Sequence, residues 1–210
     1  MQDRQTVTVL LFEQFELLDA LGPLHMFGLL PEYYQLQIIT TNGQYVTSTQ
    51  GINMQPTLSF NDTISAGILI IPGGAGMRFA THNKDILAWL KKTAPQQHII
   101  CSTSTGAALL ANAGLLNNGK ATTTQKNLDW VSQFGHNIQW QTSARWVRYG
   151  NIFTASGSSA SLDMSLAIIG HQHGDSIARR IAADTEYLWL NDPNDDPFAP
   201  LHLVNKAVYK

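Results

Sequence analysis

Residues 99–124, reading IICSTSTGAALLANAGLLNNGKATTT, decide the fold of this chain. An apolar run over residues 98–101 reaches a corner of small residues, 102–106, and continues as a helical pattern over residues 107–113. This order predicts a strand, a tight turn and a helix, with Ser104 at the turn. Such an elbow holds a side chain at the carboxyl end of a strand, beside helix N–H groups that favour developing negative charge. Ser104 is therefore the first candidate for a functional residue.

The rest of the chain alternates apolar, β-rich runs with helical patterns. The strand-like runs cover residues 7–12, 35–40, 68–71 and 98–103, and the helical patterns cover residues 18–29, 85–94, 158–169 and 176–183. Strands that are apolar almost throughout, with helices between them, are typical of parallel sheets covered on both faces. The sequence therefore predicts an α/β fold with a doubly wound, mostly parallel sheet, which is a flavodoxin-like sandwich.

Two other segments have the pattern of β-hairpins. Residues 45–49 and 52–55 flank a Gln-Gly pair, and residues 145–149 and 151–154 flank Gly150. Because glycine adopts the backbone angles that tight hairpin turns need, we interpret both segments as short antiparallel hairpin insertions.

Composition bounds the classes of protein and partner. A length of 210 residues fits one domain over residues 1–210 that can bury a substantial core. The 13 basic and 15 acidic residues give a net charge of −2, without a basic block or an acidic tail. Nothing in this pattern indicates nucleic acid or a membrane surface as a partner, so we expect a small-molecule ligand.

Targeting and redox signals are also weak. The longest apolar runs, such as residues 68–71, are far shorter than the ~18–20 residues of a membrane span. The N-terminus has no cleavage-site pattern and is interpreted as the first strand rather than a signal peptide. The single cysteine, Cys101, excludes an internal disulfide and any multi-cysteine metal site. We therefore expect a cytoplasmic protein without a metal or cofactor.

Four motifs carry a resemblance to a known family. They are LLDALGP (17–23), IPGGAG (71–76), TGAALLANAGLL (105–116) and TASGSSASLDMSL (154–166). Through them the chain resembles the ThiJ/PfpI superfamily, on the class I glutamine-amidotransferase-like fold, over residues 7–166. It is most similar to the isocyanide hydratase branch. The resemblance implies a homodimer, since the superfamily commonly dimerises.

The chain departs from this family at the reactive position. The family's nucleophilic cysteine stands directly before a Thr-Gly pair, and that position here is Ser104. Cys101 lies three residues too early and is interpreted as a buried strand residue. The histidine that many members carry after an Ala-Thr-Thr sequence falls on Thr124.

Serine at this position changes the expected chemistry. A cysteine with a pKa near ~8.5 becomes a thiolate with modest help from a helix N-terminus. A serine hydroxyl is far less acidic and needs a base beside it. Covalent chemistry by Ser104 is therefore not expected, and a small polar residue that caps the next helix is the alternative interpretation.

Asp19 is the second candidate, because it lies in the otherwise apolar start of a helix, among Leu17, Leu18 and Leu21. A helical aspartate stabilised by the helix dipole is the alternative interpretation. In the isocyanide hydratase branch the matching aspartate meets the nucleophile and handles protons, and the resemblance implies this role for Asp19. A partly buried carboxylate has a raised pKa and can act as acid and base near neutrality.

Four more residues are candidates for binding a substrate or an oxyanion. Gly73 and Gly74 follow a predicted strand, where their N–H groups could converge on the pocket, although a plain turn also uses glycine. Thr105 follows Ser104 directly. Ser158 aligns with a pocket position that is usually apolar in the hydratase branch, and an N-capping serine is the alternative.

Two polar clusters are interpreted as non-functional. His171 and His173 have no cysteine or carboxylate at ligand spacing, so we expect a solvated helix end there. Residues 192–196 lack the glycine and glutamate of a calcium loop and indicate a polar turn.

Three hypotheses for function remain open at this point. The first is a hydratase-like enzyme that adds water to an isocyanide and forms an N-substituted formamide, with Ser104 replacing the thiol or only orienting a water activated by Asp19. The second is a catalytically silent module that keeps the pocket for small-ligand binding or regulation. The third, a serine hydrolase using Ser104, is the weakest, because the sequence shows no matching acid–histidine pair.

Overall fold

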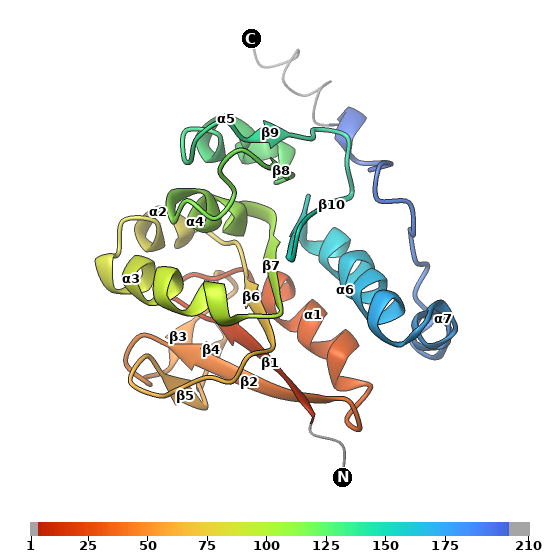
Figure 1. Ribbon diagram of the computed structural model, residues 1–210, viewed down its shortest axis with the longest axis horizontal. Coiled ribbons are helices and arrows are strands. Elements are labelled where there is room, and N and C mark those ends of the chain that lie inside the picture. Colours follow the sequence, from red (N-terminus) through yellow and green to blue (C-terminus); the bar gives the residue numbers. More distant parts are fainter. Residues whose placement is uncertain (1–3, 202–210) are drawn as a thin grey trace.

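A seven-stranded sheet forms the centre of the molecule in the computed structural model, which describes residues 4–201 (Figure 1). In sheet order the strands are β10 (Trp146–Tyr149), β11 (Ile152–Ala155), β7 (Ile99–Thr103), β6 (Ile68–Ile71), β1 (Gln5–Leu10), β2 (Tyr34–Thr40) and β5 (Leu58–Ser59). Only the β10–β11 pair is antiparallel in this sheet. Strands β6 and β7 are buried along their whole length, which explains their continuous apolar sequences.

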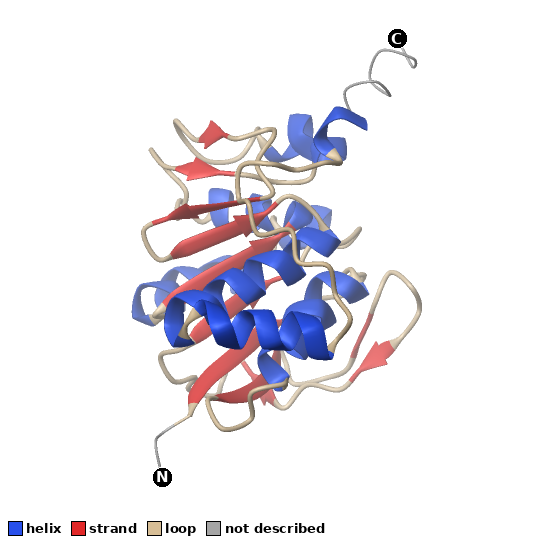
Figure 2. Cartoon of the chain, turned by 90° about the vertical axis from the view of Figure 1, so that its right-hand side faces the viewer, coloured by secondary structure: helices blue, strands red, loops and turns tan. Residues whose placement is uncertain are grey.

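Helices cover both faces of the sheet, which confirms the predicted doubly wound α/β fold. One face carries α1 (Leu17–Gly28), α6 (Ser158–His173) and α7 (Asp175–Asp184), and the other carries α2 (Met77–Ala80), α3 (Lys84–Thr93) and α4 (Ala107–Asn112) (Figures 1 and 2). The short helix α5 (Leu128–Val131) lies beyond the β10 edge (Figure 1). None of the helices within residues 4–201 has the length and apolar character needed to cross a membrane.

Both predicted antiparallel hairpins are confirmed, but the second belongs to the main sheet and is not an insertion. Strands β3 (Val46–Thr47) and β4 (Asn53–Met54) form a small antiparallel sheet outside the main one. Strand β11 is instead a parallel neighbour of β7 in the main sheet, with Phe153 opposite Cys101, and β10 closes that edge. A further two-stranded sheet, β8 (Lys120–Ala121) with β9 (Gln139–Trp140), is parallel.

The strand order creates a crevice at one edge of the sheet. Strands β7, β6 and β1 are adjacent, so the loops that follow their carboxyl ends are neighbours. The chain leaves β1 toward α1 on one face and leaves β6 and β7 toward α2 and α4 on the other (Figure 1). Such a switch point is where open α/β sheets bind their ligands. Gly73 and Ser104 lie in the segments that directly follow β6 and β7, and Asp19 lies in the first turn of α1, which follows β1.

Candidate active site

Ser104 lies in a tight 3-10 turn between β7 and α4, where the sequence predicts the elbow. Its φ of +49° is in the left-handed region, which residues with a side chain rarely adopt. The hydroxyl of Thr123 donates a hydrogen bond to the carbonyl oxygen of Ser104 at 2.7 Å. Strain of this kind at a strand-to-helix turn is typical of a functional position, and Thr123 helps to hold it. The sequence analysis did not single out Thr123 as a functional residue.

Asp19 lies in the first turn of α1 and is 0 % exposed. Its Oδ2 accepts a hydrogen bond of 2.8 Å from the N–H of Gly73. Its Oδ1 accepts no hydrogen bond from the described part of the chain. Burial raises the pKa of this carboxyl group to about 6, and the Ser158 hydroxyl and the Gly73 N–H act in the opposite direction. A carboxylate with this pKa can give and take a proton near neutrality.

The backbone N–H groups of Gly73 and Gly74 have other hydrogen-bond acceptors than the sequence analysis predicted. The Gly73 N–H bonds Asp19, and the Gly74 N–H donates to the Thr105 hydroxyl at 3.1 Å. Both N–H groups are therefore engaged within the protein, so the expectation that they converge on a reacting oxyanion is corrected. A Cβ at Gly73 would lie 2.6 Å from Oδ2 of Asp19. Glycine lets the loop after β6 approach this carboxylate closely.

A pocket of about 420 Å³ opens over the elbow. Four candidate residues line it, namely Gly74, Ser104, Thr105 and Ser158. The remaining lining residues are Glu16, Ala75, Arg78, Thr124, Lys126, Asn127, Trp130 and Gly157. Asp19 and Gly73 are not part of the lining, and the influence of the Ser158 hydroxyl on Asp19 connects the buried carboxylate to it. No histidine is among these lining residues.

Cys101 is 1 % exposed on strand β7, as the sequence predicts. Burial raises the pKa of its thiol far above the ordinary value, so a thiolate does not form there. Cys101 therefore does not take the place of the family's nucleophile, which corresponds to Ser104 at the turn after β7.

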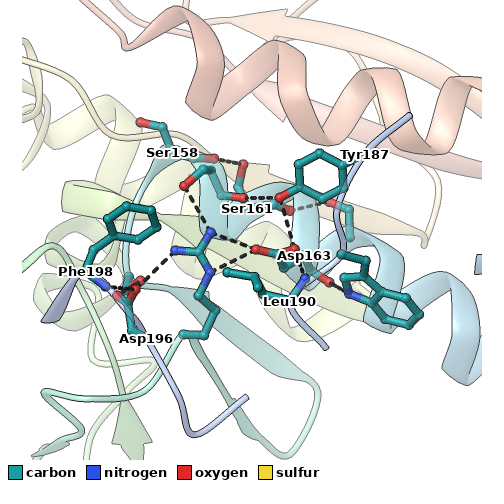
Figure 3. A network of polar contacts seen from close by, with 12 residues as sticks. Ser158, Ser161, Asp163, Tyr187, Leu190, Asp196 and Phe198 are labelled. Carbon is teal, nitrogen blue, oxygen red and sulfur yellow. Dashed lines mark hydrogen bonds and ion pairs between the residues drawn. The ribbon is translucent and has the colours of Figure 1, made fainter. Parts of the chain in front are cut away.

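A buried ionic cluster beside the pocket was missed by the sequence analysis. Arg145, directly before β10, contacts Asp163 of α6 at 2.8 Å and Asp196 at 3.2 Å. Its guanidinium also donates to the Ser159 hydroxyl at 3.0 Å, while the Ser156 hydroxyl donates to Asp196 at 2.7 Å. Figure 3 shows this cluster, with Asp163 and Asp196 on either side of the guanidinium group. The interpretation of residues 192–196 as a polar turn is confirmed for exposed Asp192 and Asn194, which share a hydrogen bond of 2.9 Å, but it is wrong for Asp196, which is buried in this cluster.

This cluster fixes the start of α6. Ser156 and Ser159, which bond to the cluster, flank Ser158 in the sequence, so the turn that presents Ser158 to the pocket is anchored. Asp163 also accepts hydrogen bonds from the Tyr187 hydroxyl at 3.0 Å and from the Leu190 N–H at 3.0 Å (Figure 3). The sequence signal that could have revealed this cluster is Asp163, a carboxylate within the largely apolar segment that forms α6.

The far end of α6 carries the two histidines. His171 is exposed, but the ring of His173 stacks on Tyr33 with centroids 4.2 Å apart and its Nε2 lies 2.8 Å from the Tyr34 hydroxyl. The expectation of a solvated helix end is therefore wrong for His173, whose pKa is lowered by desolvation. Across residues 4–201, no three His, Cys, Asp or Glu side chains gather closely enough to hold a metal ion.

Comparisons with known proteins find similar sequences and a similar fold. The family model described as "DJ-1/PfpI family" matches residues 5–171. An isonitrile hydratase of Pseudomonas putida is 31% identical over 200 residues, which cover 94% of this chain and 86% of that protein. The transcriptional regulator GbdR of Pseudomonas aeruginosa is 25% identical over 94% of this chain, which spans only 54% of the regulator. A crystal structure of a ThiJ/PfpI family protein from Pseudomonas syringae has a TM-score of 0.82 and 28% identity, covering 99% of this chain and 86% of that one.

Proposed function

This chain belongs to the DJ-1/PfpI family, and on that premise we propose that its pocket adds water to an isonitrile and forms an N-substituted formamide. The reaction makes the protein a lyase of the isonitrile hydratase type. The observation that carries this proposal is the buried Asp19 carboxylate behind the Ser104 elbow, whose pKa is raised and whose Oδ1 accepts no hydrogen bond within residues 4–201. The 31% identity to an isonitrile hydratase supports the same substrate class.

The proposed chemistry needs water, the Asp19 carboxylate and the Ser158 hydroxyl, which connects the buried carboxylate to the pocket. Through this hydroxyl Asp19 takes a proton from a water molecule while the water oxygen bonds to the terminal carbon of R–N≡C. The proton returns by the same route to that carbon, which gives R–N=CH–OH, and tautomerisation yields R–NH–CHO. A carboxyl group with a pKa of about 6 suits both steps near neutral pH.

Ser104 is proposed to orient this water rather than to attack the substrate. A serine nucleophile needs a strong base beside it, and the described lining of the pocket contains no histidine. The hydroxyl can still donate and accept hydrogen bonds at the mouth of the elbow. The expected rate is therefore low compared with a cysteine at the same position.

Two observations favour a second candidate, which is a ligand-binding or regulatory module without turnover. Ser104 replaces the family's reactive thiol, and the chain is similar over 94% of its length to a transcriptional regulator, GbdR. The two candidates share the pocket and differ only in whether the ligand is converted.

The Ser104→Cys variant separates the two candidates. A thiol at this position needs less help to ionise, so the variant should gain formamide production from an alkyl or aryl isonitrile over the parent chain. Ser104→Ala is the matched control and should gain nothing. Adding Asp19→Ala to Ser104→Cys should remove the gain if Asp19 carries the protons.

One result would overturn the hydratase proposal. If the Ser104→Cys variant makes no formamide although its new thiol reacts with alkylating agents, the binding module takes its place. Buried Cys101 does not confuse this assay, because its thiol is inaccessible.

We also propose a homodimer, because the superfamily resemblance covers most of the chain. Light scattering should then give about twice the 23.1 kDa mass of one chain. A mass near that of one chain at all micromolar concentrations would contradict this assembly.

A further inference from the structure

We propose that the ligand of the pocket carries a carboxylate group, and that Arg78 and Lys126 bind it. Both cationic side chains line the pocket above the elbow, whereas Glu16 is the single carboxylate in the lining. The pocket is thus cationic although the whole chain has a net charge of −2. As a statement about the substrate, this inference rests on the proposed function.

Within the described part of the chain, the two cations of the pocket form no ion pair with a carboxylate. Both ion pairs within residues 4–201 belong to Arg145, so Arg78 and Lys126 have no carboxylate partner within 4.0 Å there. The Glu16 carboxylate already accepts a hydrogen bond of 2.6 Å from the Gln50 side chain. A free anion that enters the pocket would therefore meet two cations with available N–H donors.

Trp130 holds one of these cations in a useful geometry. The Arg78 guanidinium lies over the Trp130 ring, 4.7 Å from its centroid, and both residues line the pocket. A stacked guanidinium keeps the N–H donors at its edge free, and this planar fork matches the two oxygens of a carboxylate. Lys126 adds a point charge from the neighbouring turn (Gln125–Asn127).

The rest of the lining favours a polar ligand over a hydrocarbon one. Four hydroxyl-bearing residues are part of the lining, namely Ser104, Thr105, Thr124 and Ser158, and Trp130 is the only large apolar residue among the lining residues. The Thr105 hydroxyl already accepts a hydrogen bond from the Gly74 N–H, but an aliphatic ligand would take water away from the other polar groups of the lining without replacing its hydrogen bonds, which costs free energy. A short ligand with a charged end satisfies them.

For the proposed reaction, these contacts specify an isonitrile whose R group bears a carboxylate. Hydration then converts an isocyano carboxylate into an N-formyl amino carboxylate. The carboxylate is unchanged in this step, and Arg78 and Lys126 act on it only as a binding handle.

The test compares two probes of nearly equal shape, one with a charged carboxylate and one neutral. N-formylglycine and N-formylglycinamide differ only in the carboxylate, and calorimetry with the full chain needs no turnover. We expect the acid to bind about tenfold more tightly than the amide, and the difference to shrink at high salt. Arg78→Gln and Lys126→Gln should each weaken binding of the acid by several-fold and leave the amide unchanged. Lys92→Gln, an exposed lysine of α3 remote from the pocket lining, is the matched control.

Each other outcome overturns the inference. Equal affinity for the two probes, no binding of the acid, or unchanged preference in both pocket variants would show that the pocket does not select a carboxylate. Inorganic phosphate and acetate serve as competitors, and stronger displacement by phosphate would assign the cations to a phosphate group instead.

The proposed function and this inference can fail separately. If Ser104→Cys forms no formamide but the acid keeps its preference, the hydratase proposal fails and the carboxylate site stands. If the Ser104→Cys variant hydrates methyl isocyanoacetate as fast as isocyanoacetate at low substrate concentration, the hydratase proposal stands and the inference fails.

Discussion

Asp19 is a carboxylate whose surroundings disfavour its charge, since it is fully buried and one of its oxygens accepts no hydrogen bond in the described chain. Its raised pKa of about 6 has a consequence for stability. The native state binds the proton more tightly than the unfolded state does, so the free energy of unfolding falls as pH rises from about 4 to about 6. Above about pH 6 the side chain is charged in both states, and its burial lowers the free energy of unfolding by the full amount.

Asp19→Asn should therefore stabilise the protein at neutral pH. A shift from 3.8 to about 6 corresponds to at most ~3 kcal/mol at pH 7.5, and the gain should vanish near pH 4, where the native carboxyl is already neutral. Urea denaturation at several pH values measures the difference. Asp184→Asn changes an exposed aspartate of α7 in the same way and is the matched control. A pH-independent difference for Asp19→Asn would contradict the desolvation argument.

Gly73 is the other residue whose identity the site requires. In Gly73→Ala the new methyl group would lie 2.6 Å from the Asp19 carboxylate and 2.7 Å from the Thr105 hydroxyl. We expect a loss of ~1–3 kcal/mol of stability, as for other overpacked sites, with displacement of Asp19. Gly157→Ala has no atom within 4 Å of its new methyl group and should cost much less. Thermal denaturation of the pair gives the comparison, and equal losses would refute the close approach.

At the residue scale the sequence predicted the elbow, the buried aspartate and the buried cysteine, because each rests on a local pattern. It could not predict that the Gly73 and Gly74 N–H groups are occupied, because their acceptors are 54 and 31 residues away in the chain. Which groups share a hydrogen bond depends on the strand order, and no local pattern contains it.

Three separate elements meet at Arg145, which lies directly before β10, contacts α6 through Asp163 and contacts the C-terminal segment through Asp196. The two carboxylates are 0 % and 6 % exposed. Two buried anions around one buried cation are stable only while the cation is present. The cluster therefore couples the sheet edge, the helix that carries Ser158 and the returning tail.

Arg145→Ala should destabilise the protein by ~3–5 kcal/mol, because it leaves the two buried carboxylates without their cation. Arg148→Ala removes an exposed arginine from the same strand region and should cost about 1 kcal/mol or less. Chemical denaturation of both variants measures the contrast. Similar, small losses in the two variants would mean that the cluster contributes little to stability.

Element positions and the two local hairpin pairings were largely predictable, and the pairing of strands far apart in the chain was not. The sequence predicted the strand at residues 68–71 with its observed bounds, because a four-residue, Ile-rich run between Gly67 and Pro72 is too short for a helix and is typical of a buried strand. It assigned residues 145–154 to an insertion, since a hairpin pattern does not tell which strand its free edge meets. The partner of β11 is β7, about fifty residues earlier, and only the assembled sheet brings the two together.

The whole molecule builds its pocket from segments that are far apart in the chain, including Glu16, Arg78, Ser104, Lys126 and Ser158. A ligand that bridges them binds the native chain and has no comparable site in the unfolded one. Ligand binding should therefore stabilise the entire fold and not only one loop.

N-formylglycine at a concentration of 100 times its Kd should stabilise the fold by ~2.7 kcal/mol. For a chain of 210 residues this gain corresponds to a rise in Tm of about 5–10 °C. N-formylglycinamide at the same concentration should give a much smaller rise, and Arg78→Gln should lose most of the response to the acid. Scanning calorimetry at one fixed protein concentration measures these shifts, because Tm also depends on concentration in a dimer. If both compounds raise Tm equally in both proteins, the stabilisation does not come from a carboxylate held by Arg78.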